Sequence, residues 1–309
     1  MKNLFLYIVA LLIIFVFTGT AKEFKFCVLG KKGTVQVKTS KSKKLEDVKT
    51  GDKLFLNDNL VLEEGSYIGL VHNNGKTIEL AKPGKYKISA LSNAAEGKKT
   101  SVLPRIANMI FNNVNRGNDL LTEKEHKSQM KSGGYIERGI GEVYLPIISP
   151  VKNHYINKNV TLCWNSYRGN PDFEFKLMNR FNKVLLTKTS ADTCISFDAE
   201  SLKLEKGTYY FWTVNLASDN DYKSREACFK LLADNEITLL NDTLKLLKDE
   251  LGDDNSAPSR IVYAFFYEQN NLYDEATKAY QQAIKLAPDV YDYVVLYEDY
   301  LARAKSSDR

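Results

Sequence analysis

NLYDEATKAYQQAIKLAPD, residues 271–289, contains small and aromatic side chains at the spacing of a helix. The members of this set follow one another at steps of three or four positions: Tyr273, Ala276, Tyr280, Ala283 and Ala287. Such steps place side chains on one helix face, and alanines on that face let a second helix approach closely. Pro288 cannot continue the helix and therefore ends it. The stretch predicts half of a helical hairpin that stacks on further helices.

Helical patterns also flank this stretch. Residues 235–252 carry leucines on one face and end at Gly252, a residue suited to close a helix. Residues 258–271 predict the first helix of the hairpin and end in a pair of asparagines that turns the chain. A last helix is expected, whose inward-facing residues are Val294, Tyr297, Leu301 and Ala304. Together these patterns predict an α-helical domain over residues 234–309.

Residues 257–290 resemble a tetratricopeptide repeat, a helix–turn–helix unit of about 34 residues. The small, aromatic and proline positions of the family fall on Ala264, Tyr267, Ala276, Tyr280, Ala283 and Pro288. Arg260 stands where the family usually has an aromatic residue. One clear repeat is present, so the resemblance implies that the flanking helices act as the neighbours that a single repeat needs.

The same resemblance implies roles for individual residues. Those expected to pack the repeat are Ala264, Ala276, Tyr280, Ala283 and Pro288. Arg260, Tyr263 and Tyr267 belong to the first helix, which lines the binding surface in this family. We therefore expect these three residues to contact a protein or peptide partner, although a place in the core is an equal alternative for the two tyrosines.

Residues 22–98 are expected to form a small all-β domain. Apolar and polar residues alternate along several short runs, as at Val35 and Val37 or at Ile78 and Leu80. This period of two is typical of strands with one buried face. Asparagine and glycine separate the runs, which fits tight hairpin turns.

From about residue 27 to residue 91 the segment resembles the FecR-like periplasmic domain. The resemblance rests on GTV at residues 33–35, GDKL at 51–54, GSY at 65–67 and NGK at 74–76. FecR proteins relay a signal from an outer-membrane receptor to a sigma factor through a cytoplasmic anti-sigma region, for which we see no counterpart. The resemblance therefore implies the domain, and FecR-type signalling remains an alternative function.

Two segments lie between the predicted β and helical domains. Residues 99–145 combine a helical pattern with a polar stretch that contains Gly133 and Gly134, and they are expected to form a partly helical connector. Residues 146–233 contain several strand-like runs and are expected to form a second β domain. Its LCW at 162–164 and GTYYFWTV at 207–214 resemble the fibronectin type III class, an immunoglobulin-like β-sandwich at about 148–232, with the aromatic residues in the core.

The N-terminus predicts export. Lys2 precedes an uncharged apolar run from Leu4 to Phe17, and small residues up to Ala21 fit a cleavage site. The run is short for a bilayer span, which needs about 20 residues. Residues 1–21 are therefore expected to be a signal peptide, with retention as a membrane anchor as the alternative.

The four cysteines leave the disulfide state open. Export permits disulfides. Three of the four lie in the second β domain, so at most one bridge can form within it: Cys163, Cys194 and Cys228. Buried free thiols are the alternative.

The sequence contains no pattern typical of a catalyst or of a metal site. His72, His126 and His154 lie in different segments, and neither a phosphate-binding loop nor a Gly-x-Ser-x-Gly turn is present. The net charge of +5 is spread out, which disfavours nucleic acid as a partner. We expect that the protein is not an enzyme and that it binds no cofactor or metal.

These features together predict a multidomain, mainly β plus α protein that is exported to the periplasm or another extracytoplasmic compartment. Its expected role is that of a scaffold or binding protein for other proteins of the cell envelope, with contact to the membrane only through an uncleaved N-terminal segment. Glycan binding by the first β domain is a further alternative.

Overall fold

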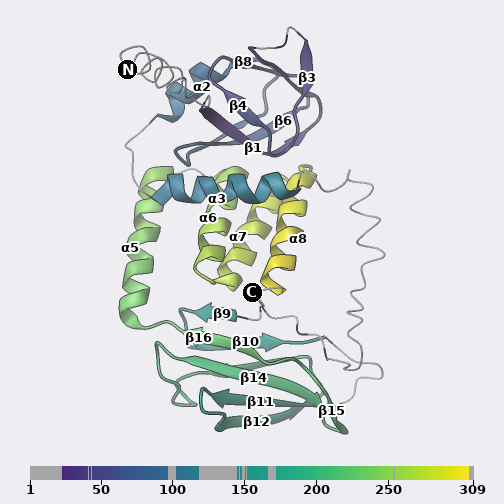
Figure 1. The fold of residues 1–309 in the computed structure, drawn as a ribbon, viewed down its shortest axis with the longest axis vertical. Coiled ribbons are helices and arrows are strands. Elements are labelled where there is room, and N and C mark those ends of the chain that lie inside the picture. Colours follow the sequence, from purple (N-terminus) through teal and green to yellow (C-terminus); the bar gives the residue numbers. More distant parts are fainter. Residues whose placement is uncertain are drawn as a thin grey trace, which may run out of the picture.

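The computed structural model describes residues 23–40, 42, 44–96, 102–117, 145, 147, 150, 152–165, 172–252 and 255–305. The expected signal peptide, His126 and the glycine pair at 133–134 lie outside these residues. Figure 1 shows one β module at one end, helices in the middle and a second β module at the other end. The chain is therefore a mixed β and α protein, as its sequence predicts, with several sheets and a helical C-terminal part.

The first β module consists of two four-stranded sheets, with strand orders β4-β1-β6-β7 and β3-β2-β5-β8. Its strands are β1 (Phe24–Lys32), β2 (Val35–Lys38), β3 (Leu45–Asp47), β4 (Lys53–Phe55), β5 (Asn59–Leu62), β6 (Tyr67–His72), β7 (Thr77–Leu80) and β8 (Gly84–Lys87). The short helix α2 (Ile88–Ala95) follows β8. Apolar residues from both sheets form one core, to which Val35, Leu60 and Leu70 belong.

Strands β1 and β6 are buried on both faces, whereas the sequence predicted one buried face. In β1, Phe26 and Val28 belong to the core of the first β module, and Cys27 and Leu29 belong to a second core shared with the helices. Successive side chains of a strand point to opposite faces, so the helices cover the outer face of this sheet. The continuous apolar run FCVL at residues 26–29 is typical of a strand in this position.

The second β module has a large sheet with the strand order β12-β11-β14-β16-β9, in which β15 also pairs with β14, and a separate pair formed by β10 and β13. Its strands are β9 (Lys152–Tyr155), β10 (Asn159–Cys163), β11 (Phe173–Asn179), β12 (Val184–Ser190), β13 (Cys194–Asp198), β14 (Tyr209–Leu216), β15 (Asp219–Lys223) and β16 (Ala227–Leu231). Leu162 and Ile195 from the strand pair meet Phe175 and Trp212 from the large sheet in one core.

The cysteines of the second β module form one disulfide. Cys163 on β10 is bonded to Cys194 on β13, and the two residues lie opposite each other in the strand pair. Cys228 is a half-buried free thiol, and Cys27 of the first β module is a buried one. Burial raises the pKa of the Cys27 thiol to about 12.

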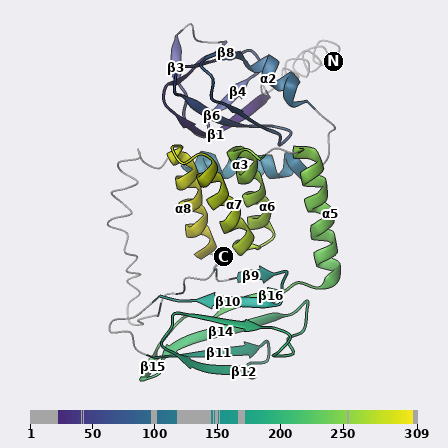
Figure 2. The same ribbon diagram turned by 180° about the vertical axis from the view of Figure 1, so that it is seen from behind.

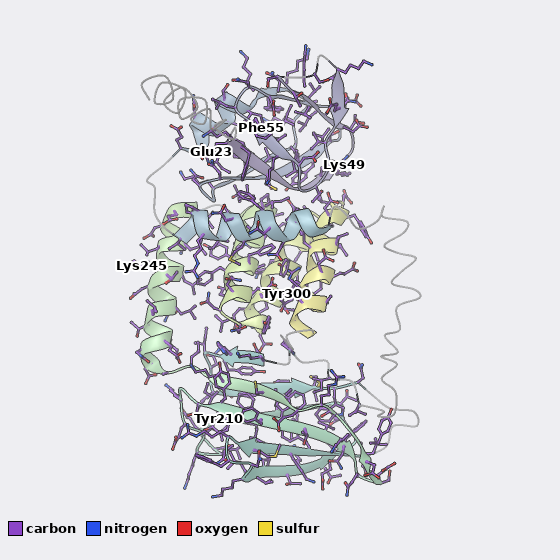
Figure 3. The ribbon with its side chains drawn as sticks, in the orientation of Figure 1. Glu23, Lys49, Phe55, Tyr210, Lys245 and Tyr300 are labelled. Atoms are coloured by element: carbon purple, nitrogen blue, oxygen red, sulfur yellow. A yellow bond between two sulfur atoms is a disulfide. The ribbon has the colours of Figure 1, made fainter. Side chains whose placement is uncertain are left out.

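The aromatic run in β14 is divided between two environments. Tyr210 and Trp212 are buried in the core, as predicted, and Tyr210 is seen there among the side chains of the large sheet (Figure 3). Tyr209 and Phe211 point to the opposite face and are half-buried. The prediction that the aromatic residues fill the core therefore holds for one half of the run and is wrong for the other half.

The helices in the middle of the molecule are α3 (Val102–Gly117), α5 (Asp234–Leu251), α6 (Ala257–Gln269), α7 (Tyr273–Leu286) and α8 (Tyr291–Lys305). Gly252 ends α5 with a φ of 70°, a conformation that favours glycine. Ser256 caps α6, where its Oγ accepts a hydrogen bond from the N–H of Ser259 at 3.3 Å. Helices α6 and α7 pack as a hairpin, and α8 follows α7 after a short turn (Figures 1 and 2).

The buried face of α8 differs from the predicted one. Its fully buried residues are Tyr293, Leu296, Tyr300 and Ala304, whereas the expected face combined Ala304 with Val294, Tyr297 and Leu301. Apolar residues occur all around α8, so spacing alone does not select a face. Contact with α7 and with the first β module selects it, and Tyr300 lies deep among the helices (Figure 3).

One large core joins the helices to the first β module. It contains residues of α3, α5, α6, α7 and α8 together with Cys27, Leu29 and Val71 from β1 and β6. We refer to it as the central core. Helix α3 contributes the residues Leu103, Ile106, Ala107, Ile110, Phe111 and Val114. The segment expected as a connector therefore includes a helix whose apolar face is part of the central core, and Figure 2 shows it crossing the other helices.

Candidate interaction surface

The three residues expected to contact a partner lie together on α6. Arg260, Tyr263 and Tyr267 are one helical turn apart, and the Arg260 guanidinium lies over the Tyr263 ring, 5.6 Å from its centroid. Arg260 also donates a hydrogen bond to Oδ1 of Asn255. The cation–π contact with Tyr263 holds the long, flexible Arg260 side chain in one orientation.

Both tyrosines of this group contact the central core and are half-buried. Burial raises the pKa of the Tyr267 hydroxyl, and the nearby Glu275 raises it further. Each ring is therefore partly fixed by the core and partly accessible, which suits a rigid contact residue. We refer to Arg260, Tyr263 and Tyr267 as the α6 surface.

The residues expected to pack the repeat lie in two different places. Ala264, Ala276 and Ala283 are fully buried between α6 and α7, where the absence of a longer side chain allows close packing. Tyr280 is also fully buried, and its ring stacks on Tyr300 of α8 with centroids 4.8 Å apart. Pro288 is exposed, in the turn between α7 and α8.

An ion pair that sequence reasoning missed connects the end of α6 to α8. Arg303 donates from Nε and from a terminal nitrogen to the two carboxylate oxygens of Glu268, at 2.7 and 3.0 Å. Tyr280 donates to the same carboxylate at 3.2 Å. Two parallel bonds between arginine and carboxylate fix orientation as well as distance. The pair therefore keeps α8 in register with α6.

The start of α8 is fixed to the first β module by polar contacts. The Asp292 carboxylate accepts hydrogen bonds from the N–H of Lys31 at 2.8 Å and from the Thr50 hydroxyl at 2.5 Å. The hydroxyls of Tyr67 and Tyr293 lie 3.1 Å apart. Backbone and side-chain donors thus converge on one helix terminus, which carries a partial positive charge and favours the aspartate.

Two glycines allow this close approach. A Cβ atom on Gly69 of β6 would overlap the Tyr293 hydroxyl and lie 2.8 Å from Cγ of Pro258. A Cβ atom on Gly30 of β1 would lie 3.0 Å from Val290 and 3.1 Å from the Tyr293 ring. Neither strand leaves room for a side chain at the point where α6 and α8 touch it.

The opposite end of the helical hairpin is hydrogen-bonded to the second β module. Asn153 of β9 accepts a hydrogen bond from the N–H of Tyr273 at 3.0 Å. The N–H of His154 donates to the carbonyl of Asn271 at 2.8 Å. Burial lowers the pKa of the His154 side chain, and Lys230 lowers it further. The turn between α6 and α7 therefore rests on an edge strand of the large sheet.

The described ranges contain neither a cluster of metal ligands nor a membrane-spanning helix. No group of three or more histidine, cysteine, aspartate or glutamate side chains in the described ranges is arranged to hold a metal ion. His72 and His154, which the structure does describe, lie in different β modules, with His72 Nε2 2.9 Å from the Ser92 hydroxyl. Within the same ranges, no helix combines the length and apolar character needed to cross a membrane.

No protein-family model matches the chain, and no curated protein matches it. Among solved structures, the chain is similar to the FN1–FN3 domains of chicken CNTN1, with 12% sequence identity and a TM-score of 0.23. The match covers 69% of this chain, which spans 59% of that one. At this identity and TM-score the similarity carries no argument about family or function.

Proposed function

We propose that this protein is a non-enzymatic scaffold that is exported from the cytosol and holds partner proteins in the cell envelope. In this proposal the first β module is FecR-like, the second is a fibronectin type III-like sandwich, and α6 and α7 form a tetratricopeptide hairpin. The α6 surface is the contact site for a protein or peptide.

The observation that carries the proposal is the position of the helical hairpin. The start of the hairpin lies against Gly69 of β6 through Pro258, and α8, which packs on α7, is hydrogen-bonded to the first β module through Asp292 and Tyr293. The turn between α6 and α7 is hydrogen-bonded to Asn153 and His154 of the second β module. A hairpin held at both ends gives a partner a preorganised surface, and preorganisation reduces the cost of binding.

Two further features support the extracytoplasmic location in this proposal. The Cys163–Cys194 disulfide is suited to an oxidising compartment. The apolar run from Leu4 to Phe17 is suited to export. The test is to express the full chain in its native host and to label cysteines from outside with a membrane-impermeant reagent. We expect the reagent to label Cys228 in cells whose outer membrane is permeabilised and whose inner membrane is intact. Labelling of Cys228 only after cell lysis contradicts export.

The contact site is tested by photo-crosslinking in the native envelope. A photoreactive phenylalanine analogue replaces Arg260 in the full chain, and the matched control carries it at Lys278, an exposed position on α7. We expect one discrete protein adduct from position 260 that is absent from position 278. An adduct with glycan alone favours the glycan-binding alternative, and a receptor or sigma-factor regulator as the adduct favours FecR-type signalling.

The energetic test uses the captured partner. Truncating a partly buried aromatic contact residue costs about 1–2 kcal/mol of binding free energy, or roughly tenfold in Kd. Tyr267→Ala is therefore expected to weaken binding by that factor. Lys278→Ala is the control, and equal effects of the two substitutions contradict the assignment of the α6 surface.

A further inference from the structure

On the outer face of the large sheet in the second β module, a row of apolar side chains lies outside the three cores formed by the described residues. The row crosses four neighbouring strands, whose residues lie opposite one another: Val184, Met178, Phe211 and Cys228. Lys152 of β9 continues the row at one end. None of the four apolar side chains belongs to any of the three cores. We refer to these four residues as the cross-strand row.

The row is partly exposed, and a further apolar side chain is exposed in the turn that precedes β12. Val184 is 47% exposed, and Phe181 in that turn is 74% exposed. Met178, Phe211 and Cys228 are half-buried. Single exposed apolar residues are common, but a contiguous apolar patch with a polar rim marks an interaction site.

Cations lie at both ends of the cross-strand row and beside it, and the acidic Glu226 lies near Cys228. Lys152 lies at one end, and Arg180 and Lys183 lie in the turn at the other end. Lys176 and Lys230 flank the row, and each has an acidic partner at 2.5 Å, Glu174 and Glu236 respectively. The Lys176–Glu174 pair is partly exposed and contributes little to stability, so Lys176 can exchange it for an acidic partner residue, whereas the Lys230 side chain is only 15% exposed and stays paired with Glu236.

Tyr209 links the row to two of these cations. The ammonium groups of Lys152 and Lys230 lie 5.6 and 5.7 Å from the centroid of its ring. His154 contributes a ring nitrogen 3.3 Å from the Tyr209 hydroxyl. The cations are thus held close to the apolar surface.

The dimensions of the row fit a helix. Five neighbouring strands at about 4.8 Å spacing span roughly 19 Å, and a helix covers that length with about 13 residues at 1.5 Å each. The backbone groups of the inner strands β11, β14 and β16 are already paired on both sides, so strand addition does not explain the surface. A helix that lies across the strands needs only its apolar stripe to contact the sheet.

We propose that this face binds an amphipathic helix of a partner protein, with its apolar side on the cross-strand row and its acidic residues against the cations at the ends of the row and beside it. The surface is separate from the α6 surface. Its test therefore does not depend on the function proposed above, and either proposal can fail alone.

The test uses methionine methyl groups as reporters in the full chain. The sequence contains four methionines, of which Met178 lies in the row and Met109 lies in α3. The probe is a synthetic, end-capped helical peptide of about 14 residues with leucines on one side and glutamates on both flanks. Its twin carries lysine in place of every glutamate. We expect the acidic peptide to shift the NMR signal of the Met178 methyl saturably and to leave that of Met109 unchanged.

Substitutions and competing ligands complete the test. Phe211→Ser and Lys152→Glu are each expected to weaken binding at least roughly fivefold, and the lysine twin to bind roughly tenfold more weakly. Thr189→Ala, an exposed change on β12 away from the row, is the control. Unchanged tryptophan fluorescence verifies that each variant is folded.

Three outcomes would overturn the proposal. The first is a Met178 signal that the acidic peptide leaves unmoved, or moves no more than the lysine twin does. The second is a Met178 shift that depends on protein concentration alone, which indicates a second copy of this chain. The third is a shift caused by an acidic polysaccharide or by anionic phospholipid vesicles but not by the peptide.

Discussion

Gly69 lies where the first β module touches α6 and α8, so Gly69→Ala tests how tightly the modules are joined. The added Cβ would overlap the Tyr293 hydroxyl and lie 2.8 Å from Cγ of Pro258. Real Cβ atoms essentially never come that close to another heavy atom, so the helices or the strand must move. Gly69 has no positive φ of the kind that disfavours alanine, so any loss of stability arises from this contact.

The expected magnitude combines two opposing effects. Overfilling a packed contact costs about 1–3 kcal/mol, whereas alanine in place of glycine inside a strand contributes about 0.5–1 kcal/mol of stability. The net loss is therefore about 1 kcal/mol, within a range of roughly 0–2.5 kcal/mol. Tyr293→Phe removes the overlapping hydroxyl, so Gly69→Ala is expected to cost about 1 kcal/mol less in that background.

The assay is hydrogen exchange measured at the amide of Lys31, whose N–H is bonded to the Asp292 carboxylate and so reports the junction. A loss of about 1 kcal/mol accelerates its exchange about fivefold. Slower exchange in Gly69→Ala would show that the added methyl group has free space around it and would refute the predicted overlap. An equal acceleration of Lys31 exchange by Gly69→Ala in the wild type and in the Tyr293→Phe background would also refute it.

Three further predictions concern the cysteines and His154. Reducing the Cys163–Cys194 bond, which closes a separation of 31 residues, should destabilise the second β module by about 3–4 kcal/mol. Fluorescence of Trp164 and Trp212, both in that module, measures the loss, and a Cys163→Ser/Cys194→Ser variant should not respond to reductant. Iodoacetamide should modify the half-buried Cys228 long before the buried Cys27, whose thiol has a pKa of about 12, and mass spectrometry that finds equal rates would contradict this. The pKa of His154 is lowered from its usual 6.5, so the folded protein binds fewer protons there than the unfolded chain, and this contribution to stability is lost as the pH falls below about 6.5. Between pH 7 and pH 5 the Tm should therefore fall further in the wild type than in His154→Gln, and parallel curves would show that His154 is not responsible.

Local features of the helices could be predicted from the sequence. The cap at Gly252, the alanines between α6 and α7 and the turn at Pro288 depend on neighbours within a few positions. The same holds for the turns of the first β module. The three residues of the α6 surface were chosen from the resemblance to the tetratricopeptide family, and helical periodicity explains only why they share one face. Their contact with a partner stays a prediction.

Contacts between distant parts of the chain could not be predicted in this way. Lys31 and Asp292 are separated by 261 positions, and no periodic pattern relates them. Gly30 and Gly69 resemble ordinary strand glycines until α6 and α8 are placed against them. The face of α8 illustrates the same difficulty, since the choice of Tyr293 over Val294 is made by the first β module.

We expect the helices to hold the two β modules in one fixed arrangement. Nitroxide labels at position 87 on β8 and position 189 on β12, in a Cys228→Ser background, place one exposed probe on each β module. Pulsed electron–electron double resonance then measures the distribution of distances between the two nitroxide labels. One narrow distribution is the predicted result, and a broad distribution in the folded protein would contradict this expectation.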